Sequence, residues 1–152
     1  MNLRAEDFLI ERTADAKDLP LPARATPMSS GLDLRANVFA DVVIGPGERA
    51  LIPAGIKIAL PMGFEAQIRP RSGLAVKYGI GLPNSPATID ADYRGELKVP
   101  LINWGSEAFT IQRGDRIAQL VICQVAMVDF TEADILPDSA RGEGGFGHSG
   151  RS

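Results

Sequence analysis

The chain has 152 residues, of which 45% are hydrophobic and 23% charged, which is typical of one globular domain with a core of its own. The formal net charge is −3, so we expect no general affinity for nucleic acid or for an anionic membrane. The single cysteine excludes an internal disulfide. With one histidine as well, the chain has no Cys/His zinc site, which excludes a zinc-dependent nucleoside deaminase.

The most apolar stretch is too short to span a membrane, because Gln119 and Gln124 interrupt it. The first twelve residues contain three acidic side chains, unlike a signal or transit peptide. We therefore expect a soluble, cytoplasmic protein.

Short β-type runs recur along the chain between turn signals. The 16 glycines and 11 prolines exceed the average share of about 12%, which favours many tight turns over a helical bundle. A short helix is predicted from Ser72. The predicted strands are 8–12, 32–36, 42–44, 49–54, 56–60, 65–70, 79–82, 88–90, 96–102, 109–111 and 116–128. This pattern predicts an all-β sandwich, jelly roll or barrel.

Residues 137–152 differ in composition from the rest. They contain five glycines and one large apolar side chain, Phe146, so they bury too little surface to offset the entropy of ordering. We therefore expect a single β domain over residues 1–136 and a mobile arm over 137–152. Arg141 and Phe146 give this arm a cation and a flat ring, which suits closure over an anionic, aromatic ligand.

Residues 69–73 read Arg-Pro-Arg-Ser-Gly and lie between a predicted strand and the predicted helix. Backbone N–H groups at a helix N-terminus favour an anion, and Arg71 and Ser72 add a cation and a hydroxyl. Ser72 also fits an ordinary N-cap. The two interpretations are compatible, because a cap can be displaced or shared when phosphate binds.

Asp90 is a candidate general base acting on water. In an extended strand Ile89 and Asp90 face opposite sides, so that Ile89 can pack in the core while Asp90 faces a pocket. A single aspartate is more often solvated surface. Upstream, Asn84 lies between two prolines and offers the donor and acceptor needed to read a pyrimidine edge, although an asparagine there is also typical of a turn.

Asp33 lies between two leucines of a predicted strand. If both leucines face the core, Asp33 faces the other way, where it could bind Mg²⁺ directly or through water. In the last predicted strand, alternation places Ile117 and Gln119 on one face. Gln119 then needs a backbone or a ligand partner.

Five segments in this order resemble the motifs of the trimeric deoxyuridine triphosphatases (dUTPases). They are residues 30–34, 70–75, 84–95, 116–119 and 141–147, and the resemblance extends over about residues 30–150. It implies a distorted jelly-roll β-barrel (dUTPase-like, or β-clip) with one short helix and a flexible C-terminal arm. It also implies a homotrimer in which each active site draws residues from more than one subunit, and in which the arm of one subunit closes a neighbour's pocket.

The resemblance further implies hydrolysis of dUTP to dUMP and pyrophosphate, which limits uracil incorporation into DNA and supplies dUMP for dTMP synthesis. Asp90 would activate the water that attacks the α-phosphorus. Mg²⁺ is the implied cofactor, held mainly by the triphosphate, with Asp33 holding a water of its shell. The implied substrate-binding residues are Arg71, Ser72, Gly73, Asn84, Thr88, Ile89, Asp90, Tyr93, Lys98, Gln119, Arg141, Phe146 and Gly147.

Within this set the resemblance divides the ligand as follows. Asn84 and the backbone of residues 88–90 would bind uracil, Lys98 would contribute through its backbone, and Tyr93 would lie against the deoxyribose. Residues 71–73 and Gln119 would line the phosphates. Arg141 would cap the γ-phosphate, and Phe146 would stack over uracil.

Two alternatives remain open. The dCTP deaminases share the fold without zinc, but an ungapped alignment through Asp90 places Pro100 where they have a catalytic glutamate. A non-enzymatic nucleotide-binding trimer would be favoured by loss of Asp90 or Arg141, and both are present.

Overall fold

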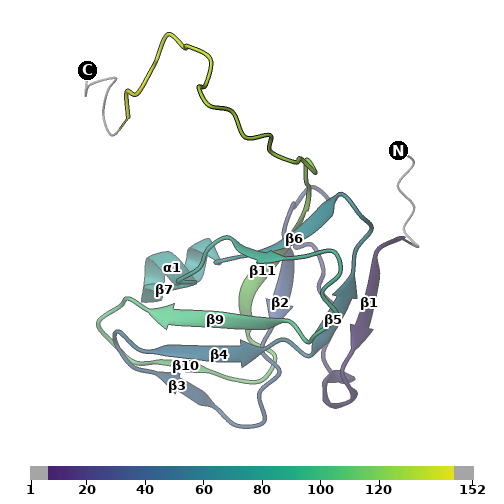
Figure 1. The fold of residues 1–152 in the computed structure, drawn as a ribbon. Coiled ribbons are helices and arrows are strands. Elements are labelled where there is room, and N and C mark those ends of the chain that lie inside the picture. The colour runs from purple at the N-terminus through teal and green to yellow at the C-terminus, as the bar shows by residue number, and fades with distance from the viewer. Residues whose placement is uncertain (1–6, 146–152) are drawn as a thin grey trace.

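The computed structural model describes residues 7–145. Within this range the chain forms eleven strands, one α-helix and one 3-10 helix (Figure 1). None of the helices of the described chain is long and apolar enough to cross a membrane. The elements are β1 (Leu9–Arg12), the 3-10 helix Ala14–Ala16, β2 (Leu32–Arg35), β3 (Val42–Ile44), β4 (Arg49–Pro53), β5 (Ile56–Ala59), β6 (Phe64–Arg69), α1 (Ser72–Tyr78), β7 (Ile80–Gly81), β8 (Ala87–Ile89), β9 (Lys98–Asn103), β10 (Phe109–Ile111) and β11 (Arg116–Gln124).

The described strands form four small antiparallel sheets. Their orders are β1–β5, β10–β3, β2–β11–β6–β8 and β4–β9–β7. Most strands pair with partners distant in the sequence; β2, for example, pairs with β11. Strands β8 and β9 follow one another in the chain but belong to different sheets, so residues 90–97 form a corner between two sheets.

An aliphatic core lies between the sheets. Strand β6 alternates as predicted: Ala66 and Ile68 are buried, whereas Glu65, Gln67 and Arg69 lie on the outer face. The buried hydrophobic side chains of the described chain are all alanine, valine, leucine or isoleucine. This agrees with the low aromatic content and with tight packing of thin sheets.

Each predicted strand corresponds to an observed one, and the predicted helix is α1. Strand β11 ends at Gln124, four residues before the predicted end. Val125 still donates its N–H to the carbonyl of Gly63 at 2.9 Å. Beyond Val125 the sequence stays apolar, but no neighbouring strand pairs with it. The sequence pattern predicted a longer strand because it shows the apolar residues and not their pairing partners.

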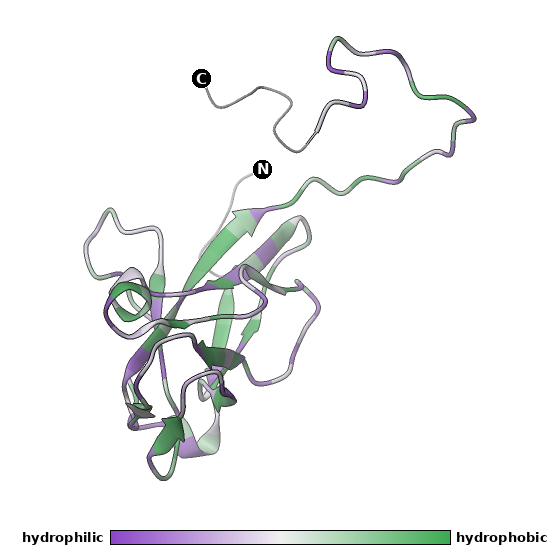
Figure 2. Cartoon of the chain, turned by 90° about the vertical axis from the view of Figure 1, so that its left-hand side faces the viewer, coloured by the Kyte–Doolittle hydropathy of each residue, from purple (hydrophilic) through white to green (hydrophobic). Residues whose placement is uncertain are grey.

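From residue 126 the chain extends away from the body (Figure 1). Apolar stretches continue along this segment (Figure 2), and the side chains of Met127, Phe130, Ile135 and Leu136 are largely exposed, Phe130 to 97%. Further along, the hydrogen bonds are local, such as that from the Gly142 N–H to the Ser139 carbonyl at 3.0 Å. This segment therefore adds little to the packing of a single copy.

Candidate functional site

The predicted site residues that the structure describes fall mainly into two groups on the sheet β2–β11–β6–β8. The first group surrounds Asp33 on β2, at one edge of the sheet. The second lies on β8, at the other edge, and in the corner that follows it. Three strand spacings separate the two edges, which is about 14 Å.

Gln119 lies at the centre of the first group. It pairs with Asp33 on one side and with Arg69 on the other, so the three side chains form a row on the outer face of the sheet. The Gln119 side-chain amide donates to the carbonyl of Pro70 at 2.9 Å. The partner that Gln119 requires is therefore backbone, one of the two predicted possibilities, and this bond fixes the segment that leads into α1.

Arg71 follows directly and is held from two sides. Its Nε lies 3.2 Å from Oδ1 of Asp33, and its Nη1 donates to the carbonyl of Arg116 at 3.0 Å. Arg116 in turn places its own Nη1 3.1 Å from Oδ2 of Asp33. Asp33, Arg71 and Arg116 thus form a closed cluster, called here the Asp33 cluster. The Asp33 side chain is only 19% exposed.

Two sequence-based expectations near this cluster are wrong. Alternation predicted Ile117 and Gln119 on one face, but Ile117 is an extra residue in a β-bulge, so Ile117 and Ala118 are both buried. Ser72 is not the N-cap of α1. That position belongs to Arg71, with φ −91° and ψ 126°, and no side chain caps the helix. The Ser72 hydroxyl is therefore not used as a cap.

The second group begins on β8. Thr88 pairs with Gln67 and faces outward, and Ile89 packs against the core, as predicted. Asp90 is exposed and lines a hollow of about 580 Å³, together with Glu65, Asp92 and the start of the C-terminal segment. Among the described strands, β8 pairs only with β6, so its other backbone edge is open to a ligand. Asn84 is exposed in the loop before β8.

Tyr93 folds back within the corner. Its hydroxyl donates to the Glu96 carbonyl at 3.2 Å, and its N–H donates to the Asp90 carbonyl at 3.1 Å. Gly95 makes this possible, because a Cβ at position 95 would lie 2.5 Å from Cζ of the tyrosine ring. The segment Tyr93-Arg94-Gly95 thus fixes the position of the Tyr93 ring through local contacts.

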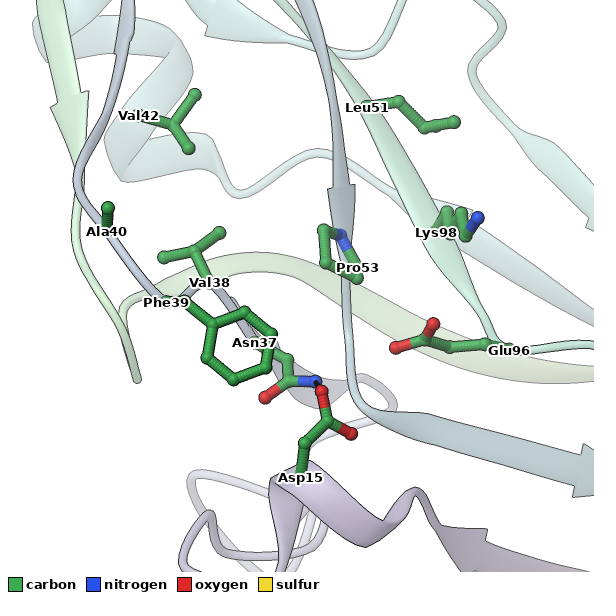
Figure 3. A pocket seen from close by; sticks show the side chains of 10 residues that line it. All are labelled: Asp15, Asn37, Val38, Phe39, Ala40, Val42, Leu51, Pro53, Glu96 and Lys98. Carbon is green, nitrogen blue, oxygen red and sulfur yellow. Dashed lines mark hydrogen bonds between the residues drawn. The ribbon is translucent and has the colours of Figure 1, made fainter.

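Lys98 is the first residue of β9, and its side chain is exposed. It lines a separate hollow of about 490 Å³ with Glu96, Leu51, Pro53 and others (Figure 3). Of the predicted site residues that the structure describes, Lys98 alone lines this hollow. This orientation is compatible with the expected backbone role of Lys98.

The predicted arm is described as far as residue 145. Arg141 is exposed, and its Nε donates to the Gly144 carbonyl at 2.7 Å, within the arm itself. Phe146 and Gly147 lie outside the described residues.

A further charged cluster anchors the 3-10 helix. Arg113 donates to both carboxylate oxygens of Asp18, at 2.7 and 3.1 Å, and to the carbonyl of Asp15 at 2.6 Å. The bonds from Arg113 hold the pKa of Asp18 below its ordinary value of 3.8. Hydrogen bonds from Thr13 and Asn37 lower the pKa of Asp15 in the same way. The pairing also raises the pKa of Arg113.

The fold and these two groups define a small, mostly β protein with a cationic cluster at one sheet edge and an exposed carboxylate corner at the other. Comparison with protein families then identifies it: residues 17–150 match the dUTPase family model. The chain belongs to the dUTPase family.

Two relatives are similar over nearly the whole chain. The deoxyuridine 5'-triphosphate nucleotidohydrolase of Thermoanaerobacter sp. (strain X514) is 59% identical over 141 residues, covering 93% of this chain and 95% of the relative. The enzyme of the same name from Caldanaerobacter subterraneus subsp. tengcongensis is 56% identical with the same coverage.

Solved structures agree in fold. A point mutant of the dUTPase of Staphylococcus bacteriophage 80alpha with dUpNHpp has a TM-score of 0.84 at 24% identity, covering 95% of this chain and 98% of that one. A point mutant of the dUTPase of phage phi11 of S. aureus, described with a structural Mg(II) ion, has a TM-score of 0.76 at 20% identity and covers 86% of this chain and 99% of that one. These similarities confirm the predicted jelly-roll architecture.

The described residues offer Mg²⁺ no site built from their side chains alone. In the described part of the chain, no group of three or more His, Cys, Asp or Glu side chains could hold a metal ion. Both Asp33 oxygens accept from arginines, but each carboxylate oxygen keeps a lone pair that can accept from water. Asp33 could therefore contact Mg²⁺ through a water if a ligand supplied the remaining oxygens.

Proposed function

We propose that the protein hydrolyses dUTP to dUMP and pyrophosphate. The observation that carries the proposal is the convergence of Asp33, Arg71 and Gln119, from three segments distant in the sequence, near one sheet edge of a dUTPase-family chain. Arg71 and Gln119 offer guanidinium and amide donors there, which suit phosphate oxygens.

The base and the sugar would bind at the corner between β8 and β9. The open backbone edge of residues 88–90, with the Asn84 amide, offers donors and acceptors to the uracil edge, and the Lys98 backbone adds to it. Cytosine would place a donor against a donor and is disfavoured. Tyr93, held by its bond to Glu96, would lie against the deoxyribose and leave no room for a 2′-hydroxyl.

Asp90 would act as the general base. It takes a proton from a water whose oxygen forms a bond to the α-phosphorus, while the bond from that phosphorus to the oxygen bridging to the β-phosphate breaks in line. Pyrophosphate leaves and dUMP remains. General-base assistance contributes only about 10²–10⁴ in rate, so positioning and charge stabilisation must supply the remainder.

The phosphates would bind Arg71, Ser72, Gly73 and Gln119. The free Ser72 hydroxyl supports this assignment, because it makes no capping bond. Mg²⁺, when bound with the triphosphate, neutralises phosphate charge, and Asp33 would hold it through a water. Arg141 of the arm would cap the γ-phosphate, and Phe146 with Gly147 would cover the uracil.

We infer that the working site needs more than one copy of the chain, as a homotrimer provides. In one copy the Asp33 cluster and Asp90 lie at opposite sheet edges about 14 Å apart, whereas the water that Asp90 activates must lie within about 3 Å of it, beside the phosphates that Arg71 would bind. A second copy can bring its own Arg71 to those phosphates. The exposed apolar segment after β11 supports assembly, because its side chains lack cover in one copy. Residues 137–152 would then act as an arm on a neighbouring copy, with residues 1–136 as the domain.

In a cell this reaction limits uracil incorporation into DNA and supplies dUMP for dTMP synthesis. We place the protein in the cytoplasm, where the small-molecule substrate dUTP would be its ligand. Neither nucleic acid nor a membrane is required as a partner.

The test compares Asp90→Asn with Asp92→Asn, a matched loss of a carboxylate in the same hollow. Pyrophosphate release is measured with dUTP, dCTP, dTTP and UTP, and Mg²⁺–dUTP binding by calorimetry. We expect the wild type to prefer dUTP, and Asp90→Asn to bind dUTP but lose about 10²–10⁴ in turnover. Near-normal turnover of Asp90→Asn, or an equal loss in Asp92→Asn, contradicts the assignment of the base.

A further inference from the structure

The β-bulge in β11 changes which side chains share a face. Arg116 pairs with Arg35 and Ala118 with Leu34, which leaves Ile117 as the extra residue. Without it, Arg116 and Gln119 would face opposite sides of the strand, because they are three residues apart. With it, both lie outside while Ile117 and Ala118 turn into the core. The bulge therefore brings Arg116 to Asp33.

Arg116 also determines which bonds Asp33 can form with Arg71. A carboxylate with both oxygens available binds a guanidinium through two parallel bonds. Here Oδ2 of Asp33 accepts from Nη1 of Arg116 at 3.1 Å. Arg71 therefore contacts only Oδ1, through its Nε, at 3.2 Å. Its Nη1 is directed to the Arg116 carbonyl at 3.0 Å. Most of the five N–H donors of Arg71 are thereby left for another acceptor.

The charges of the Asp33 cluster also favour an Arg71 guanidinium that is available to a ligand. One carboxylate lies between two guanidinium groups, so the cluster keeps one positive charge. If the Arg116 side chain were removed, Asp33 and Arg71 could close into a neutral bidentate pair. The charge of Arg71 would then be neutralised by Asp33. Its pair of parallel N–H donors would be directed at Asp33 instead of at a ligand.

We propose that Arg116 is a positioning residue, which occupies one oxygen of Asp33 so that the Arg71 guanidinium stays directed toward the substrate phosphates. The proposal rests on the proposed function in taking Arg71 as a phosphate ligand. It adds a residue that need not touch the substrate and a bulge that places it.

The test uses Arg116→Met with Arg35→Met as the matched control. Arg35 lines the same hollow as Asp33 and Arg116, but its Nη1 bonds to the Gly114 carbonyl at 2.7 Å. Both variants lose one positive charge near Asp33, and only one loses the contact with it. We measure kcat and KM for dUTP and the inhibition constants of inorganic pyrophosphate and of deoxyuridine, which carries no phosphate.

For Arg116→Met we expect the KM for dUTP and the pyrophosphate inhibition constant to rise about tenfold, as for loss of one charge-assisted contact. The deoxyuridine constant should stay within about twofold, because no phosphate is involved. Arg116→Lys, which keeps a cation for Oδ2, should restore part of the pyrophosphate affinity. Arg35→Met should behave as the wild type.

Two results overturn the proposal: equal effects of Arg116→Met and Arg35→Met, or a deoxyuridine constant that rises as much as the pyrophosphate constant. Melting temperatures verify folding, and if Arg116→Met does not fold, Arg116→Gln, which also lacks the charge, serves for the same comparison, where an unchanged pyrophosphate constant counts against the proposal. A wild type inactive on dUTP refutes the proposed function instead. Direct calorimetry of pyrophosphate binding then still tests Arg116.

Discussion

Gly95→Ala should damage the nucleotide site without unfolding the protein. A Cβ at residue 95 would lie 2.5 Å from Cζ and 3.0 Å from Cε2 of the Tyr93 ring, against an ordinary contact of 3.4 Å or more. The ring must therefore retreat by about 1 Å, since overlap of this size cannot be tolerated. Because Tyr93 is 44% exposed, it can do so by turning toward solvent.

A displacement of about 1 Å at a positioning residue can cost about 10²-fold in rate, so we expect kcat/KM for dUTP to fall by about that factor. The ratio of kcat/KM between dUTP and UTP should fall too, because the ring would no longer exclude a 2′-hydroxyl. The melting temperature should change little, since the one side-chain bond at risk is the exposed bond from Tyr93 to the Glu96 carbonyl.

Tyr93→Ala and the double variant complete the experiment. If Gly95 acts only by making room for the ring, Gly95→Ala has no further effect once Tyr93 is alanine. Tyr93→Phe keeps the ring and should retain most of the discrimination. The reasoning fails if Gly95→Ala keeps normal kcat/KM and selectivity, or if the two losses multiply in the double variant.

Three further predictions concern the arm and the stability of the fold. Truncation after Pro137 should lower turnover on dUTP strongly and leave the melting temperature nearly unchanged, because the bonds of the described arm are local; a large drop in melting temperature would make the arm structural. Arg113→Met should lower the melting temperature at pH 7. The bonds from Arg113 lower the pKa of Asp18, so the stabilisation from this pair is present above pH 3.8 and is lost as the pH falls below it; the difference from wild type should shrink there, and a difference that grows in acid would contradict the assignment. Asn103→Leu leaves three backbone groups without their buried partner and should lower the free energy of unfolding in urea by about 3 kcal/mol, whereas a loss below about 1 kcal/mol would mean that water replaces the amide.

Much of the local structure could be predicted from the sequence, because it depends on local signals. Alternation located β6, and glycine and proline marked the turns between strands. Even the opposite orientations of Ile89 and Asp90 followed from strand geometry. The pairing of β8 with β6, and of β9 with another sheet, could not be predicted, since strand partners are chosen by contacts far apart in the sequence.

The residues of the candidate site could be predicted from the sequence, but not all of their contacts. Asp33, Arg71 and Gln119 were singled out, but the contact between Asp33 and Arg116 depends on the bulge at Ile117, which strict alternation missed. A signal existed, because Ile117 and Ala118 are two successive apolar residues between two polar ones. The N-cap at Arg71 was missed because a serine next to a helix start is so often the cap.

The central claim is that one copy of the chain supplies Asp90 to a site and a different copy supplies Arg71. The most direct measurement co-expresses Asp90→Asn and Arg71→Ala subunits under two tags, purifies assemblies carrying both, and assays dUTP hydrolysis. Each variant alone should be nearly inactive. Shared sites predict recovery of about a third of the wild-type activity, because every trimer that contains both variants has one site in three that pairs the intact halves. Mixed assemblies as inactive as either variant alone would contradict the claim.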